Sequence, residues 1–190
     1  MINLNLVNIR DFATDKHRTT DDRPFGGGPG MIMKVGPIDR ALESLGLVKG
    51  QPSKRILLLS ARGKQFSQRW AKELVKLDEL TLICGHYGDV DQRVADHLVD
   101  GEISIGEFIL TGGEPGALVI VDAVSRLIPG VLGNESSLKR ETHSEKGLVS
   151  VPAYTRPAEY KGWKVPEVLL SGDHQKIKEW KEQSQIKIDN

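Results

Sequence analysis

The sequence has little cysteine and no long apolar run, and each shortage excludes a class of protein. Cys84 is the lone cysteine among 190 residues, which excludes a disulfide framework and a four-cysteine zinc site and fits a reducing cytoplasm. No apolar stretch approaches the roughly 20 residues that a membrane helix needs. The first residues also lack the charged start and apolar core of a signal peptide. We therefore expect a cytoplasmic protein that does not enter a membrane.

Net charge is absent as well. The 26 lysines and arginines balance the 26 aspartates and glutamates, whereas a strongly basic chain would have indicated a nucleic-acid partner. Any RNA would have to be bound through local geometry or over the surface of a dimer. Aromatic residues make up only 5% of the chain, and we expect Trp70 and Trp180 to serve in packing rather than in base stacking.

What the sequence does contain is an alternation of short apolar runs with segments of helical periodicity. This alternation predicts the α/β class, with a mostly parallel sheet covered by helices. The strands are expected at residues 2–9, 55–60, 80–85 and 104–110, and the helices at 37–46, 67–77, 90–99 and 116–127. A further helix is expected after Asp173, which has the side chain of a helix N-cap.

Three glycine-bearing loops follow predicted strands: SARGK (60–64), CGHYGDVD (84–91) and TGGEPG (111–116). Glycines there let backbone N–H groups approach a ligand, or they simply turn corners. Three such loops at one sheet edge favour a ligand cradle built from main chain, since ligands bind at the carboxyl ends of parallel strands. None of the loops has the glycine spacing of a dinucleotide fold or of a phosphate-binding loop.

The stretch HRTTDDRPFGGGPGM (17–31) is too rich in glycine and proline for a helix or an interior strand. Its aspartates could accept hydrogen bonds from a guanine and its arginines could bind phosphate, or the loop could be a solvated, charged surface. Arg126, at the end of an apolar helix, is open to a carbonyl-capping or a functional interpretation. The histidines are scattered without the spacing of metal ligands.

Several of these segments occur together in one known family. The order DDRPFGGGPGM, SIGEFILTGGE, DAVSRLIPGVLG, YTRP and VPEVLLSG resembles the TrmD family of bacterial tRNA (guanine-N1-)-methyltransferases, of the SPOUT class. The resemblance implies an α/β fold with a deep trefoil knot and a homodimer with shared active sites. It also implies S-adenosyl-L-methionine as methyl donor, a requirement for Mg²⁺, and methylation of N1 of the guanine immediately 3′ of a tRNA anticodon.

The resemblance assigns roles to particular positions. Arg126 matches the family's catalytic arginine, and Glu141 is our choice for the general base. The positions matching cofactor contacts are Leu59, Ser60, Gly85, Tyr87, Ile105, Gly106, Leu110, Gly112 and Gly113. The positions expected to contact the substrate are Arg18, Asp22, Gly27 and Gly28.

Departures from the family pattern leave alternatives open. The segment KRETHSEKG is one residue longer than usual, so either Glu141 or Thr142 occupies the position of the base. The second glycine loop reads GHYGD where the family has G-R-Y-E-G, so His86 and Gly88 replace an arginine and a glutamate. An active methyltransferase is the first hypothesis. The second is a relative that binds S-adenosylmethionine or RNA without turnover.

The resemblance also predicts a division of the chain into three parts. Residues 1–133 would form the methyltransferase domain, without the strand and helix with which the family begins. Residues 134–164 would form a mobile linker. Residues 165–190 would be a remnant of the helical tRNA-binding domain.

Overall fold

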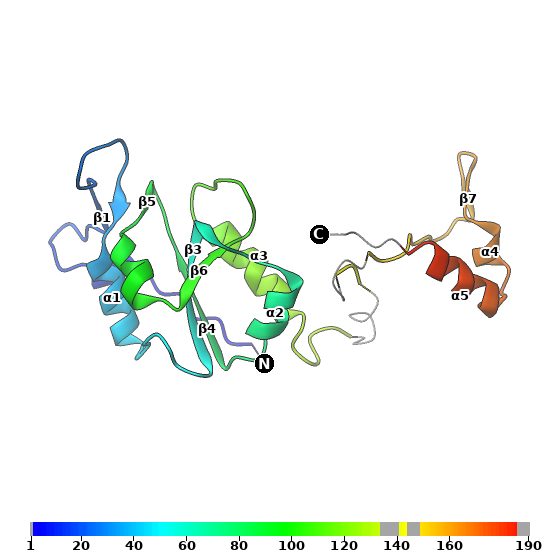
Figure 1. The fold of residues 1–190 in the computed structure, drawn as a ribbon, viewed down its shortest axis with the longest axis horizontal. Coiled ribbons are helices and arrows are strands. Elements are labelled where there is room, and N and C mark those ends of the chain that lie inside the picture. The colour runs from blue at the N-terminus through cyan, green and yellow to red at the C-terminus, as the bar shows by residue number, and fades with distance from the viewer. Residues whose placement is uncertain (1, 134–140, 144–148, 186–190) are drawn as a thin grey trace. The chain divides into compact units, whose positions relative to one another are not determined.

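The computed structural model describes residues 2–133, 141–143 and 149–185. The chain forms two compact units, Met1–Val131 and Leu132–Asn190, and each is described by itself (Figure 1).

A three-stranded parallel sheet lies at the centre of the first unit. Its strands are β3 (Lys54–Gln65), β4 (Glu79–Cys84) and β6 (Gly101–Ser104), in the order β4-β3-β6. A smaller sheet joins β1 (Asp21–Asp22), β2 (Ile32–Met33) and β5 (Asp89–Val90), with β1 antiparallel and β5 parallel to β2.

Helices cover both faces of the central sheet (Figure 1). Successive side chains of β3 point to opposite faces, so its run of apolar residues supplies a buried surface on each face. Ile56 and Leu58 pack with α1 (Val35–Ser44) and with a π-helix, η2 (Val94–Leu98). Leu57 packs on the other face with α2 (Gln68–Leu74) and α3 (Glu114–Ser125). The predicted α/β class with a parallel sheet covered by helices is confirmed.

Strand β3 meets β6 twice. Leu57, Leu58 and Leu59 pair with β6, and the register then shifts. Ile103 of β6 is consequently the partner of both Leu59 and Lys64. A Cβ on Gly63 would lie 2.4 Å from the Ile103 nitrogen, so this close approach requires glycine. The strand is therefore longer than the predicted 55–60 and includes the SARGK segment.

Two of the strand predictions are wrong. Residues 2–8 form no strand and are exposed, and Asn8 instead caps a short 3₁₀ helix, η1 (Ile9–Phe12). The strand predicted for 104–110 ends at Ser104, because the Ser104 hydroxyl donates to the Gly106 carbonyl at 2.9 Å and accepts from the Gly106 N–H at 3.2 Å. These local bonds turn the chain out of the sheet.

The helix predicted for 90–99 is shorter than expected. Its first residue belongs to β5, and the regular part is the π-helix η2. The helix expected from Pro37 begins two residues earlier, at Val35. It ends before Gly46, whose φ of 64° suits the residue after a helix.

The second unit is built from a hairpin and two helices. These are β7 (Glu159–Tyr160), β8 (Trp163–Lys164), α4 (Glu167–Leu170) and α5 (His174–Gln183). Asp173 caps α5 as expected, since its carboxylate accepts from the N–H groups of Gln175 and Lys176 at 3.1 Å. None of the described residues of this unit is buried.

Candidate active site

A cavity of about 290 Å³ opens at the carboxyl ends of β4 and β6 and beside residues 59–62 of β3, and we call it the strand-end cavity. It is lined by residues of all three glycine loops. Every position that the resemblance matched to a cofactor contact is among them: Leu59, Ser60, Gly85, Tyr87, Ile105, Gly106, Leu110, Gly112 and Gly113. Positions distant in sequence are thus brought together at the sheet edge where ligands bind in parallel α/β folds.

Glycines are required where the second and third loops touch. The Gly113 N–H donates to the Gly85 carbonyl at 2.8 Å, and a Cβ on Gly113 would lie 2.8 Å from the Cα of Cys84. An isolated β-bridge joins His86 to Gly112. The two loops therefore form one continuous wall made largely of main chain.

The lining of the strand-end cavity combines apolar side chains with glycine main chain. Leu59, Ile105 and Leu110 supply apolar surface, and the glycine loops supply main-chain donors and acceptors. Cys84 ends β4 beside this wall. Burial, followed by the negative charge of Glu114, raises the pKa of its thiol to about 11.

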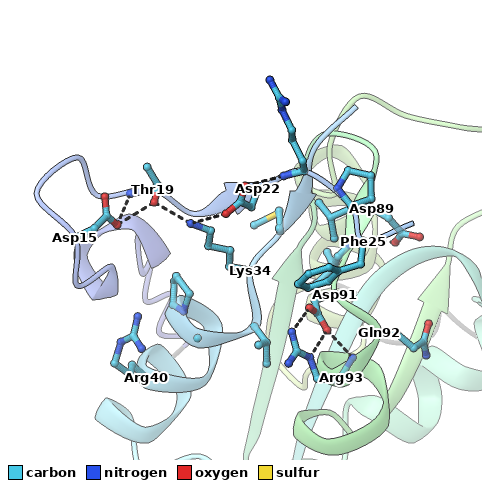
Figure 2. A pocket seen from close by; sticks show the side chains of 18 of the residues that line it. Asp15, Thr19, Asp22, Phe25, Lys34, Arg40, Asp89, Asp91, Gln92 and Arg93 are labelled. Atoms are coloured by element: carbon cyan, nitrogen blue, oxygen red, sulfur yellow. Dashed lines mark hydrogen bonds and ion pairs between the residues drawn. The ribbon is translucent and has the colours of Figure 1, made fainter. Parts of the chain in front are cut away.

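A second and larger cavity, of about 760 Å³, lies between the β1–β2 hairpin, the start of α1 and β5, and we call it the hairpin cavity (Figure 2). Asp22 lies in its wall with one carboxylate oxygen 3.4 Å from the Lys34 ammonium. The Arg23 N–H, and after it Lys34, hold the pKa of the Asp22 carboxyl below its usual value. Asp22 therefore presents a charged acceptor to this cavity at neutral pH.

The two cavities share a wall. Arg62, Asp89 and Val90 line both of them, and the Arg62 guanidinium lies 3.1 Å from the Asp89 carboxylate. Neither Arg62 nor Asp89 was predicted as a site residue, although both lie inside glycine-bearing segments of the sequence (60–64 and 84–91). A ligand in one cavity would lie next to a ligand in the other.

The remaining predicted substrate residues lie outside the hairpin cavity lining. Arg18 forms an ion pair with Asp11 at 3.2 Å, and neither it nor Gly27 nor Gly28 lines the cavity. Their expected contact with the substrate stays a prediction.

The two residues predicted to be catalytic lie in different units. Arg126 ends α3 and lines neither of these cavities, and its main-chain N–H donates to the Asp122 carbonyl at 3.2 Å. Glu141 belongs to the second unit. The catalytic roles of both residues stay predictions.

The described residues contain neither a metal-binding cluster nor a membrane-spanning helix. Among residues 2–133, 141–143 and 149–185, no three His, Cys, Asp or Glu side chains are grouped so that they could hold a metal ion. In the same part of the chain, no helix has the length and apolar character needed to cross a membrane.

Together these features define an α/β protein that builds a small-molecule cavity at the carboxyl ends of its parallel strands. Comparison with known proteins then identifies the family. Residues 1–189 match the family described as tRNA (Guanine-1)-methyltransferase TrmD, and the chain belongs to this family.

Individual relatives agree with this assignment. The chain is 50% identical over 186 residues to the tRNA (guanine-N(1)-)-methyltransferase of Geobacillus kaustophilus, an overlap of 98% of this chain and 75% of the relative. It is 51% identical over 186 residues to the enzyme of the same name from Persephonella marina, covering 98% of this chain and 72% of the relative. The resemblance seen in the motifs is confirmed.

Proposed function

We propose that the protein transfers a methyl group from S-adenosyl-L-methionine to N1 of the guanine immediately 3′ of a tRNA anticodon. The observation that carries this proposal is the meeting of nine matched cofactor positions in one cavity, which adjoins a second cavity containing Asp22. Relatives that carry the name of this enzyme are about half identical to the chain. This favours an active enzyme over a relative that binds without turnover.

Different residues can carry out different parts of the methyl transfer. S-adenosylmethionine, when bound in the strand-end cavity, supplies the electrophilic methyl group. Asp22 is charged and can accept hydrogen bonds from the donor edge of guanine. Guanine N1 carries a proton at neutral pH, so a base must remove it, and a carboxylate is suited to that task. The Arg126 guanidinium would stabilise negative charge that develops on O6.

Glu141 is the better choice for the base than its neighbour. The Thr142 hydroxyl lies 2.8 Å from the Ser150 hydroxyl and accepts from the Ser150 N–H at 3.1 Å. A threonine hydroxyl is a poor base near pH 7, whereas a glutamate carboxylate can accept a proton. We therefore assign the proton transfer to Glu141.

We further propose that the enzyme is a homodimer in which each active site takes residues from both protomers. Helix α3 carries apolar residues on its outer side, with Leu118 69% exposed. Ile109 in the preceding loop is 81% exposed. A helix that is apolar all round is normally covered by protein. An active site shared between protomers also accounts for Arg126 lining neither cavity of its own chain.

The second unit offers features suited to RNA. The exposed rings of Tyr160 and Trp163 lie 5.9 Å apart at the hairpin, and the Lys161 ammonium lies 5.4 Å from the centre of the Tyr160 ring. Exposed aromatic rings beside lysines are typical of surfaces that stack on bases and bind phosphates. We infer that this unit contacts the tRNA.

The deep trefoil knot is also part of the proposal. Its support is the family to which the chain belongs, because the resemblance to that family implies the knot. Pulling the chain taut from its two ends should leave it shorter than its full contour length, because a tightened knot retains residues. Full extension would contradict the knot.

The activity is tested by incubating the protein with labelled S-adenosylmethionine, Mg²⁺ and an unmodified tRNA that has guanine after the anticodon. We expect N1-methylguanine as product. Absence of product with cofactor binding intact would overturn the proposal in favour of a non-catalytic relative. Chelation of Mg²⁺ should lower turnover, although the described residues offer no cluster to which the ion could be assigned.

The choice of base is tested by two variants of adjacent residues. Glu141→Gln should lower kcat about 10²- to 10⁴-fold, the usual contribution of a general base. Thr142→Ala, the matched control, should retain activity. The reverse pattern would show that the longer segment places residue 142 at the reactive proton.

A further inference from the structure

Arg62 and Asp89 form an ion pair at the wall that the two cavities share. The Arg62 Nη2 lies 3.1 Å from an Asp89 carboxylate oxygen, and the two side chains are 56% and 43% exposed. Both residues line the strand-end cavity and the hairpin cavity. The pair is therefore open to a ligand in either cavity.

The main chain holds both members of this pair in place. The Arg62 N–H donates to the Ser60 hydroxyl at 3.2 Å, in the part of β3 where the register with β6 shifts. Asp89 is the first residue of β5 and pairs with Ile32 of β2. One Asp89 carboxylate oxygen accepts from the Val90 N–H at 2.8 Å, and the other faces the Arg62 guanidinium. Asp89 thereby orients the guanidinium at the shared wall.

The same pair supplies opposite charges to the strand-end cavity. Among the described residues that line this cavity, Arg62 is the single lysine or arginine and Asp89 is the single aspartate or glutamate. A ligand that carries one carboxylate and one ammonium group thus finds one partner of opposite charge for each. An ionised group that enters a cavity without such a partner loses hydration and gains nothing in return.

Residue 88 cannot readily supply a carboxylate to this wall. A Cβ on Gly88 would lie 3.2 Å from the Met31 carbonyl oxygen, which also accepts from the Gly88 N–H at 3.0 Å. A side chain at this position would crowd the main chain before β2. The loop reads GHYGD where the family pattern is G-R-Y-E-G, so in this chain the carboxylate stands one position later, at Asp89.

The hairpin cavity, by contrast, has several cations of its own. Arg23, Lys34, Arg40 and Arg93 line it in addition to Arg62. A phosphate that enters the hairpin cavity has these other partners. A carboxylate in the strand-end cavity has Arg62 as its one lysine or arginine partner among the described lining residues. This distribution of charge favours assigning Arg62 to the ligand of the strand-end cavity.

We propose that Arg62 and Asp89 bind the zwitterionic amino-acid end of S-adenosylmethionine, the guanidinium through the α-carboxylate and the aspartate through the α-ammonium group. This inference rests on the proposed binding of S-adenosylmethionine in the strand-end cavity. A guanidinium carries five N–H donors in a planar fork, so it can bind a second carboxylate while it keeps its contact with Asp89. The sulfonium is two methylene groups from the α-carbon, so these contacts hold the methyl group near the cavity that contains Asp22.

The size of the effect follows from the partial exposure of the pair. Hydrogen bonds to charged groups are stronger than those between neutral groups, but water competes for half-exposed side chains. We expect loss of the Arg62 contact to raise the dissociation constant of a ligand with the complete amino-acid end about 5- to 30-fold. A ligand without that end should bind with unchanged affinity.

The test is isothermal titration with three ligands that share the adenosine and the sulfur. S-adenosylhomocysteine has the complete amino-acid end, its decarboxylated form keeps the ammonium group, and 5′-methylthioadenosine has neither charge. Arg62→Gln should weaken binding of the first about 5- to 30-fold and leave the other two within about twofold. Asp89→Asn should weaken the two ligands that carry the ammonium group. Arg62→Lys, which keeps the charge without the fork, should lose less than Arg62→Gln.

Arg69→Gln is the matched control, because Arg69 lies in α2 with a side chain that is 91% exposed and lines neither cavity. It should bind all three ligands as the wild type does. Binding of 5′-methylthioadenosine also shows that each variant has kept the cavity folded.

Two results for Arg62→Gln would overturn the assignment while leaving the proposed function intact. Equal losses for S-adenosylhomocysteine and 5′-methylthioadenosine would show that Arg62 only shapes the cavity. An unchanged affinity for S-adenosylhomocysteine would remove Arg62 from the cofactor, and a raised KM for tRNA in the same variant would assign it to the RNA. Failure of the wild type to bind S-adenosylhomocysteine would overturn the cofactor cavity and this assignment together.

Discussion

The two compact units of this chain obtain their order by different physical means. In the first, residues such as Ile38, Ile56 and Ile120 are almost completely buried against a parallel sheet. In the second, no described residue is buried, and the observed contacts are local ones such as the Asp173 cap and the Tyr154–Trp180 ring pair at 6.3 Å. Burial stabilises the first unit, whereas turns, caps and ring contacts shape the second.

The largest effect on folding should come from truncating the core of the first unit. Ile120→Ala removes a side chain that has no exposed surface, and should lower the free energy of unfolding by about 2–5 kcal/mol. Leu170→Ala makes a comparable change in a helix of the second unit, where the side chain is 58% exposed. Its cost should stay within about 0.5 kcal/mol. Urea denaturation measures both, and equal losses would erase the contrast between the units.

Glycines provide the next contrast. Gly113→Ala would force a Cβ to 2.8 Å from the Cys84 Cα, so we expect a loss of about 1–3 kcal/mol of stability from overpacking and weaker cofactor binding. Gly133→Ala in the second unit meets nothing within 4 Å and should be nearly neutral. Denaturation and calorimetry distinguish them. If Gly113→Ala changed neither stability nor cofactor binding, the cavity wall would have to move enough to accommodate the added methyl group.

Removal of the helix cap tests the local order of the second unit. Asp173→Ala leaves the N–H groups of Gln175 and Lys176 without their acceptor, and should cost about 1 kcal/mol of helix stability. Hydrogen exchange in the first turn of α5 should accelerate accordingly. Asp173→Asn retains an acceptor oxygen and should behave like the wild type. Equal exchange in all three proteins would show that packing, not the cap, holds this helix.

The smallest effect on folding is expected at the exposed hairpin. Trp163 is 73% exposed, so Trp163→Ala should change stability by no more than about 0.5 kcal/mol. It should nevertheless raise the KM for tRNA severalfold while leaving the KM for S-adenosylmethionine unchanged, because the lost ring would stack on a base. Trp163→Phe should restore much of the loss. An unchanged KM for tRNA in the alanine variant would remove the hairpin from the RNA contact.

Much of the first unit could be predicted from sequence because its elements follow the periodicity of burial. The strand predicted at 80–85 and the helix predicted at 116–127 are found within two residues of their expected bounds, whereas the strand predicted at 55–60 continues to Gln65. Alternation failed at residues 2–9, where Ile2, Leu4 and Leu6 are exposed. A strand needs a neighbour to bond with, and the pattern of one segment cannot reveal whether a neighbour exists.

The candidate site likewise has some features that could be predicted from the sequence and others that could not. Glycine loops after strands predicted the strand-end cavity, because the carboxyl ends of parallel strands meet at one edge. The shared wall of Arg62 and Asp89 could not be predicted, since their contact depends on how the second half of β3 approaches β5. Nor could the end of β6 at Ser104, which is decided by a single hydroxyl bonding to Gly106.

The close packing of Gly63 against Ile103 has a kinetic consequence. Residues 64 and 65 can pair with β6 only after residues 66–100, which separate the two strands in sequence, have brought Ile103 and Ser104 into place. Closing so long a connection is an entropic cost that folding meets before the contacts repay it. The same pairing has to be undone before the sheet can open. Slow folding and slow unfolding should therefore accompany one another in this protein, and the lifetime of the native state should exceed what its equilibrium stability alone would suggest.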